Sequence, residues 1–496
     1  RLAPHANHNL GVQYTAPSGA YLSLAYAGTN ERTKGNTFNT NRLEDAEGVL
    51  NYASNIERNE TNRVRSLSLN YGQDLDSLGS RLFVGGQYVR YATTGDNPIS
   101  ERGEAVTGTT LRELRNLIET GIEVASAQID YTKVFPSGLR LETGLRHGAV
   151  DNRSDFDFSI AENGQDFRPS AELSSLHRYR EGVSAAYASV NGRLSKQLSY
   201  GLGLRSELTD YRLQLDEGGK LTDRYVNVFP NASLLWSLPD GRSLNLTYVA
   251  RINRPPFRNL NPNLIYQDPY TSIQGNPELL PERTHAVELT GKHGPMSLKV
   301  GYTYTTSPMG GSALPGDTPR SYVLKRLNFS EAHAWYAAAT HTLSNAWWSA
   351  TTTLSVTREQ IYAYEFDFRP VPPRPQPYLF TNHRFTLGKL AKLEALFYYV
   401  GELREGTFTR YDNANLTLTL EKAVFEDKLL VRFTANDLFN TVRASGDYRQ
   451  GETDIYFDNK WRSSYLRLSL RYDFGRLAED RYRNEATGRA EGRRAQ

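Results

Sequence analysis

Few side chains in this sequence are placed to carry out chemistry. The chain has no cysteine, which removes cysteine nucleophiles, disulfide bonds and Cys-ligated zinc or iron–sulfur sites. His5 and His8 have a spacing that suits a metal on a helix, but they lie in a polar entry to a strand, and a chance pair is favoured. No nucleophile elbow, metal-binding helix or phosphate loop is recognisable. We therefore expect no catalytic residues, no metal site, no cofactor and no enzyme activity.

Arginine and aromatic side chains are better candidates, because they could bind a ligand without transforming it. Arginines in the predicted strands could attract an anionic ligand, namely Arg140, Arg146, Arg205 and Arg251. Aromatic residues in loops or strand tips could stack on a flat or apolar ligand, namely Phe257, Tyr266, Tyr270, Tyr362 and Tyr364. Two structural alternatives stay open: the arginines could pair with Glu142, Glu207 and Glu288, and the aromatics could form a girdle or pack loop on loop.

Composition narrows the class of protein. The 496 residues include 58 basic and 55 acidic side chains, and this small excess gives no argument for a nucleic-acid partner. No window holds 18 consecutive apolar residues, which excludes a transmembrane helix. A transmembrane β-barrel stays possible, because only alternate residues of its strands face lipid.

Apolar residues recur with a period of two. They alternate with polar residues from Met296 to Tyr304, and again near the end of the chain. Alternation of this length places all apolar groups on one face of a strand. One stretch, 108–120, has helical spacing and is expected to be a short helix in a loop. The chain is therefore predicted to be all-β. The last alternating series consists of Leu466, Leu468, Leu470, Tyr472 and Phe474.

Short turns and long polar segments take turns along the chain. About 19 strands are predicted, and this order is typical of an outer-membrane barrel with short periplasmic turns and long extracellular loops. Charged residues on the opposite strand face would line a polar lumen. Long loops are expected near 30–60, 93–118, 150–176, 255–280, 309–321, 360–376 and 446–460. Aromatics beside the short turns or at the last strand end predict a periplasmic girdle, namely Phe135, Trp236, Trp347, Trp348 and Phe474.

Three stretches resemble the C-terminal barrel of TonB-dependent outer-membrane transporters, particularly the outer-membrane β-barrel family abundant in Bacteroidota. The first, Arg251 to Glu282, reads RINRPPFRNLNPNLIYQDPYTSIQGNPELLPE. The second, Ala435 to Asn440, is similar to the late-barrel DLFN run of the family. The last strand, YLRLSLRYDF, resembles the signal that the barrel assembly machinery reads, with Phe474 as its terminal aromatic.

The resemblance implies an antiparallel barrel of 22 strands closed by a plug. The plug and the first strands are expected to lie outside this chain. Residues 1–475 would form the barrel, and residues 476–496 a charged periplasmic tail. The partners that the resemblance implies for the whole protein are outer-membrane lipid, an inner-membrane TonB complex that acts through the plug, the barrel assembly machinery and a surface lipoprotein.

The implied function is uptake of a scarce substrate across the outer membrane of a Gram-negative bacterium. The substrate could be a ferric siderophore, another metal chelate, an oligosaccharide or a peptide. The alternative is a non-transporting barrel that serves as scaffold or partner subunit of a larger surface assembly. An outer-membrane hydrolase is a weaker third hypothesis, because no catalytic constellation is visible.

Overall fold

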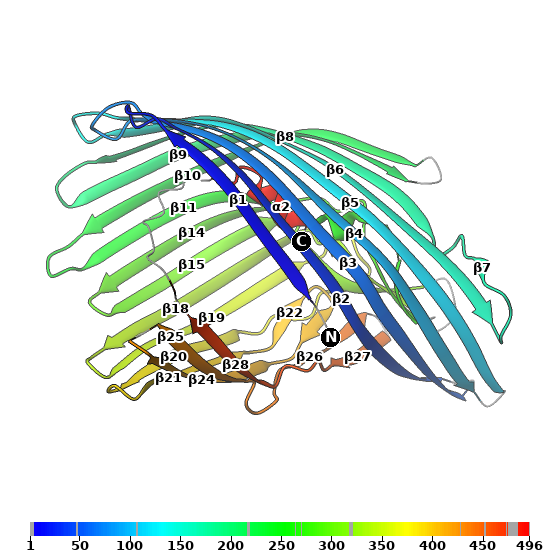
Figure 1. Cartoon of the computed structure of the whole chain (residues 1–496). Helices are drawn as coiled ribbons and strands as arrows, with labels where there is room; N and C mark the ends of the chain where they lie inside the picture. Colours follow the sequence, from blue (N-terminus) through cyan, green and yellow to red (C-terminus); the bar gives the residue numbers. More distant parts are fainter. Residues whose placement is uncertain are drawn as a thin grey trace.

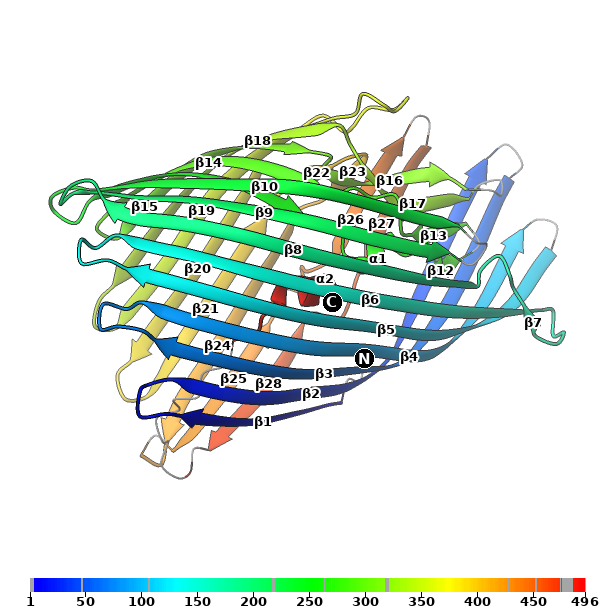
Figure 2. The ribbon, with the colours of Figure 1, turned by 90° about the horizontal axis from the view of Figure 1, so that it is seen from above.

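The computed structural model describes residues 4–45, 48–105, 108–215, 219–262, 264–268, 270–316, 321–426, 428–450, 453–472, 474 and 485–495. Nineteen strands form one continuous antiparallel wall that curves round a wide interior (Figures 1 and 2). Each wall strand pairs with the next wall strand of the sequence. The wall consists of β1 (His5–Thr15), β2 (Tyr21–Asp45), β3 (Gly48–Asp74), β4 (Arg81–Ala105), β5 (Gly108–Val134), β6 (Arg140–Glu162), β8 (Ser175–Arg193), β9 (Leu198–Leu215), β10 (Lys220–Ser237), β11 (Ser243–Asn253), β14 (Glu282–His293), β15 (Met296–Thr306), β18 (Glu331–Ser344), β19 (Trp348–Tyr362), β20 (Gln376–Leu387), β21 (Ala391–Val400), β24 (Asn413–Val424), β25 (Leu429–Asn436) and β28 (Tyr465–Tyr472).

Most of the remaining elements come from the long connections, at the end of the wall opposite the short turns, whereas the C-terminal helix follows the last wall strand and lies inside the wall (Figure 2). One small sheet contains β12 (Leu264–Asp268), β13 (Thr271–Gln274), β16 (Met309–Pro315) and β17 (Tyr322–Asn328). A second contains β22 (Leu403–Glu405), β23 (Phe408–Arg410), β26 (Ala444–Gln450) and β27 (Thr453–Asn459). The two-residue strand β7 (Arg168–Pro169) pairs with β6. Two short helices, α1 (Phe257–Leu260) and α2 (Arg489–Ala495), complete the described part of the chain, and neither is long or apolar enough to cross a membrane.

The wall is apolar outside and polar inside. On β9, Leu202 and Leu204 are exposed on the outer face, whereas Arg205 and Glu207 form an ion pair on the inner face. The apolar residues of the last alternating series are exposed in the same way, as the alternation predicts: Leu466, Leu468, Leu470 and Tyr472 of β28, and Phe474 just beyond it. The predicted all-β antiparallel barrel wall of about 19 strands is confirmed. Recognition of the last strand by the assembly machinery stays a prediction.

Two predicted loops and the predicted helix are wrong. Segments 30–60 and 93–118 lie mostly within β2, β3, β4 and β5, which extend as tall hairpins beyond the other strands (Figure 1). Segment 108–120 is the first half of β5, and it pairs with β4 on one side and β6 on the other. An isolated helix of this length is marginal in water, so two ladders of backbone hydrogen bonds decide the conformation. Leu114 then points inward and is buried with Ile99 and Phe158.

The Asn-Pro motifs of the 255–280 segment act as turn chemistry. The backbone N–H of Asn276 donates to the carbonyl oxygen of Asn259 at 2.5 Å, and the side-chain oxygen of Asn276 accepts from the N–H of Glu278 at 3.1 Å. The Asn276 side-chain amide donates to the Arg326 carbonyl oxygen at 3.0 Å. These bonds fold the segment back into the barrel and hold it against β17.

Replacing Gly275 by alanine should loosen this fold. A Cβ at Gly275 would lie 2.0 Å from the carbonyl oxygen of Asn261, so one of the two backbone segments must shift. We expect Gly275→Ala to destabilise the segment by about 1–2 kcal/mol, as overpacking does. Limited proteolysis should cut residues 255–280 faster than in the parent protein, while Gly121→Ala, at a position in open space, should leave the rate unchanged. Equal cutting rates in all three would contradict the close approach.

Candidate functional site

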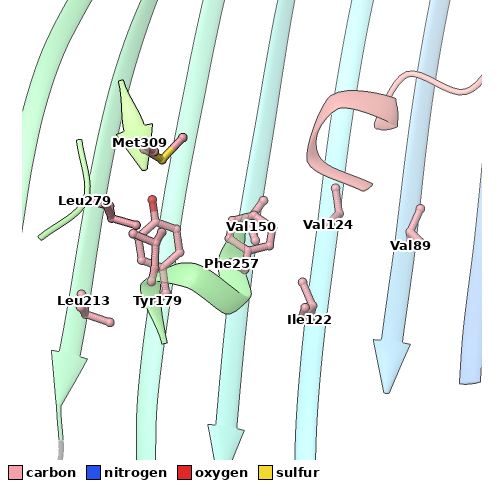
Figure 3. Close-up of a cluster of buried hydrophobic side chains, with 10 residues drawn as sticks. Val89, Ile122, Val124, Val150, Tyr179, Leu213, Phe257, Leu279 and Met309 are labelled. Atoms are coloured by element: carbon pink, nitrogen blue, oxygen red, sulfur yellow. The ribbon is translucent and has the colours of Figure 1, made fainter. Parts of the chain in front are cut away.

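An apolar patch covers part of the inner face of the wall. Val89, Ile122, Val124, Val150, Tyr179 and Leu213 point inward from β4, β5, β6, β8 and β9. The folded-back segment packs on them through Phe257, Leu260 and Leu279, and Met309 joins from β16 (Figure 3). Phe257 is 2% exposed and lies 5.7 Å from the Tyr179 ring. This patch fixes the segment inside the barrel.

A network of alternating charges borders the patch. Arg254 lies 2.7 Å from Glu207 and 3.5 Å from Glu181, and all three side chains are at least 87% buried. Glu207 also holds Arg205 at 2.6 Å, and the Tyr179 hydroxyl donates to Glu181 at 3.1 Å. Buried charges persist when they are paired and hydrogen-bonded, as these are. The network ties β8 and β9 to the segment that follows β11.

The C-terminal segment supplies a further charge to the same network. The sequence predicts a periplasmic tail from residue 476, but residues 485–495 lie against the inner face of the wall (Figures 1 and 2). Arg494 donates to Glu181 at 2.5 Å and lies 4.3 Å over the Phe257 ring. The prediction and the structure differ because Glu491 and Arg494 pair with wall residues more than 300 positions earlier in the sequence, and local patterns do not reveal such pairs. Residues 476–484 and 496 fall outside the described residues.

A cavity of about 490 Å³ opens between the wall and these two inner segments. Its basic lining groups are Arg63, Arg258 and Arg494, against one acidic group, Glu31. Tyr91, Phe156 and Phe257 contribute aromatic surface to it. Guanidinium groups and ring faces together suit an anionic, flat or aromatic ligand. This cavity is the candidate ligand site.

The four candidate arginines do not converge on one site. Arg140 pairs with Glu142 at 2.5 Å and lines a separate cavity of about 870 Å³ near the short turns. Arg146 binds the C-terminal segment. Arg205 pairs with Glu207, and Arg251 is exposed on β11. Glu288, the third expected acidic partner, pairs with Lys299 at 3.0 Å. The ion pairs agree with the structural alternative, and ligand binding by these arginines stays a prediction.

The candidate aromatics also separate. Phe257 lines the candidate cavity, whereas Tyr266 is buried against Phe158 and Tyr270 meets the Tyr52 ring edge-on at 5.6 Å. Tyr362 and Tyr364 stack on each other at 5.8 Å at the end of β19, and the Tyr364 hydroxyl donates to Glu331 at 2.9 Å. Four of the five therefore pack loops and strand ends together.

Sequence reasoning missed the cavity arginines Arg63, Arg258 and Arg494. It also missed Glu181 and Arg254 of the bordering charge network. Arg254 stands in the motif that carries the family resemblance, just before Pro255, and its charge in an otherwise turn-forming stretch was an available signal. Glu181 follows the inward-facing Tyr179 by two residues on β8, so strand parity could have placed it in the lumen. No local signal placed Arg494.

A buried carboxylate, Asp268, links the first small sheet to β2. Asp268 accepts hydrogen bonds from the N–H groups of Tyr270 and Thr271, both at 2.8 Å, and from the Asn41 amide of β2 at 2.7 Å. Burial raises the pKa of Asp268 above its ordinary 3.8, because it outweighs these bonds. A raised carboxyl pKa contributes stability that is present below 3.8 and lost as the pH rises through the folded value.

Asp268→Asn should therefore protect residues 264–274 more than the parent at pH 7. The asparagine oxygen can still accept from both N–H groups, and Asn41 can turn its own oxygen to the new amide. Hydrogen exchange, corrected for intrinsic rates, should show less protection in the parent at pH 7 than at pH 4. The Asn variant should show no such difference. Weaker protection of the variant at pH 7 would contradict the raised pKa.

Comparison with known proteins was made for the whole chain. Residues 73–472 match the outer membrane protein β-barrel family. No protein among curated sequences matches.

Solved structures share the fold at low identity. The closed form of the ferric-catecholate import receptor Fiu from E. coli K12 has a TM-score of 0.60 and 12% identity, over 95% of this chain and 80% of that one. The ferric citrate transporter FecA in its unliganded form has a TM-score of 0.56 and 13% identity, over 95% and 76%. The ferric yersiniabactin uptake receptor FyuA from Yersinia pestis has a TM-score of 0.50 and 13% identity, over 94% and 79%. All three are named as receptors or transporters.

Proposed function

Because this chain belongs to the outer membrane protein β-barrel family, and lies in the outer membrane of a Gram-negative bacterium, we propose that it is the barrel of a TonB-dependent receptor that takes up a ferric siderophore or another anionic metal chelate. One observation carries the choice of substrate. The candidate cavity inside the wall combines three arginines and three aromatic rings with a single carboxylate. An oligosaccharide would need no such excess of positive charge, and the six neutral polar side chains of the lining could hydrogen-bond to either class of ligand.

The shape of the wall favours a transport function over a barrel whose interior is filled by its own side chains. A wall of this many strands encloses more space than its own side chains fill. The tall hairpins β2 to β6 rise at the end away from the short turns, and the two small sheets gather at that end (Figure 2). A ligand arriving from outside would meet these elements first and the cavity next.

We further propose that strands and a plug upstream of this chain complete the barrel. Among the described residues, β1 pairs only with β2 and β28 only with β25. Nineteen antiparallel strands leave these two edges running in the same direction. An unpaired edge in lipid would leave backbone groups without hydrogen bonds, at a cost of several kcal/mol for each group. The intact mass and N-terminal sequence of the native protein should show a mass well above 56.0 kDa and a plug-like segment.

Uptake tests the function. A strain that lacks the gene should lose accumulation of labelled ferric siderophore under iron limitation, and the parent strain should lose it when the proton gradient is dissipated. Arg63→Gln with Arg258→Gln should weaken binding of the anionic chelate without lowering the amount of barrel in the membrane. Arg242→Gln, at a short turn far from the cavity, is the matched control. Unchanged uptake in the deleted strain would contradict transport. If the barrel of the parent strain were also found in a stable surface complex, the scaffold alternative would be favoured.

A further inference from the structure

The C-terminal segment makes a set of specific contacts with the inner wall. The Thr487 hydroxyl lies 2.8 Å from the Ser126 hydroxyl of β5, and the Gly488 N–H donates to the Gln87 side-chain oxygen of β4 at 2.9 Å. The Arg146 guanidinium of β6 donates to the Thr487 carbonyl oxygen at 2.8 and 3.1 Å. These contacts fix the backbone of the segment as well as its side chains.

The charges of α2 match those of the wall. Glu491 pairs with Arg146 at 2.5 Å, and Arg494 pairs with Glu181 at 2.5 Å and donates to the Pro255 carbonyl oxygen at 3.1 Å. Residues three apart lie on the same face of a helix, so one face of α2 presents a carboxylate and a guanidinium to groups of opposite charge. The four side chains are at least 87% buried. Breaking a pair this buried is costly, because it leaves a charge without compensation.

The wall also leaves room for this helix. A Cβ at Gly148 of β6 would lie 2.5 Å from the Glu491 carboxylate oxygen. A larger residue at this inward position would therefore displace the Glu491 carboxylate from its place beside Arg146. Charge, hydrogen bonds and shape thus agree on the same occupant.

We propose that the inner face of β4, β5, β6 and β8 is a docking site for a peptide segment that carries a glutamate and an arginine three residues apart, and that residues 485–495 of the same chain are its resident occupant. Arg494 and Ala495 line the candidate cavity, so the docked segment forms part of the wall that a ligand meets there. The inference stands whether or not the barrel transports the proposed substrate.

A cysteine pair tests the position in the full-length protein. The chain has no native cysteine, so Ser126→Cys with Thr487→Cys gives one unambiguous disulfide. Mild oxidation of outer membranes should link the two residues in most molecules, as mass spectrometry of the linked peptides would show. Ser126→Cys with Arg489→Cys, whose side chain is exposed, is the matched control and should link far less. Absence of the first link, or equal linkage in both pairs, would overturn the proposal.

A wall variant tests the site independently of the tail sequence. Gly148→Val should lower the yield of the 126–487 link, because it displaces the Glu491 carboxylate, whereas Gly121→Val, where an added side chain meets open space, should preserve it. Both barrels should be present in the membrane in equal amounts. Linkage that survives Gly148→Val unchanged would mean that the segment docks elsewhere.

A free peptide tests whether the site recognises sequence. A labelled peptide of residues 485–495 should bind barrels in which Glu491→Lys and Arg494→Glu have undocked the resident segment, and it should bind the parent barrel much less. The same peptide with these two charges exchanged should bind neither. Equal binding of both peptides, or none to the undocked barrel, would contradict recognition by paired charges.

Discussion

Leu354→Arg should remove most of the barrel from the outer membrane. Leu354 lies in β19, is 57% exposed on the outer face, and has Ala339 and Leu379 as its cross-strand neighbours. A cation at this position would face hydrocarbon, which costs roughly 2–4 kcal/mol at the bilayer midplane. The fraction of chain that resists heat and detergent on a gel measures the folded barrel, and this fraction should fall sharply in the variant.

The adjacent residue provides the control for depth and strand. Ser355 is one position along β19 and therefore points to the lumen, where Lys299 and Glu288 already form an ion pair. Ser355→Arg should assemble at close to the parent level, because water and carboxylates are available on that face. Similar losses in both variants would show that crowding of the strand is responsible. Similar retention would show that the outer face does not meet lipid.

Period two explains how much of this fold the sequence reveals. Met296 to Tyr304 alternate as predicted and lie in β15, and the last alternating series lies in β28 up to Tyr472. Strand parity is a local property, so one strand suffices to read it. The length of the tall hairpins cannot be predicted from local sequence. Segment 108–120 has helical spacing, and only its pairing with β4 and β6 makes it a strand. Intrinsic helix propensity predicts the conformation poorly where two neighbouring strands offer ladders of backbone hydrogen bonds instead.

The candidate site depends still more on distant contacts. Arg146 was a reasonable ligand candidate by its charge, but its partner Glu491 lies 345 positions away. Phe257 was expected in an extracellular loop, and the turn chemistry of Asn276 instead brings it into the lumen against Tyr179. Composition identifies such residues as able to bind. It does not decide whether they bind a ligand or another part of the chain.

The DLFN run shows a motif whose role is structural. Asp437 is 0% exposed and has a left-handed φ of 47°. One carboxylate oxygen accepts from the N–H and the hydroxyl of Thr441 at 2.8 and 3.2 Å, and the other accepts from the Ser463 hydroxyl at 2.5 Å and the Val442 N–H at 3.2 Å. The carboxylate therefore joins the end of β25 to the segment that leads into β28.

Asp437→Ala should destabilise the barrel by roughly 2–3 kcal/mol, because buried donors that lose a charged acceptor keep their desolvation cost. Burial opposes ionisation, but the hydrogen bonds from Ser463, Thr441 and Val442 outweigh it and hold the pKa of Asp437 below its ordinary 3.8. A lowered carboxyl pKa gives stability that is present above 3.8 and lost as the pH falls through the folded value. Urea unfolding of barrels in lipid vesicles should show the full difference from the parent at pH 7 and a smaller one as the pH falls below 3.8. Asp412→Ala, at an exposed carboxylate, should match the parent, and a difference that grew on acidification would show that the carboxylate is not the stabilising group.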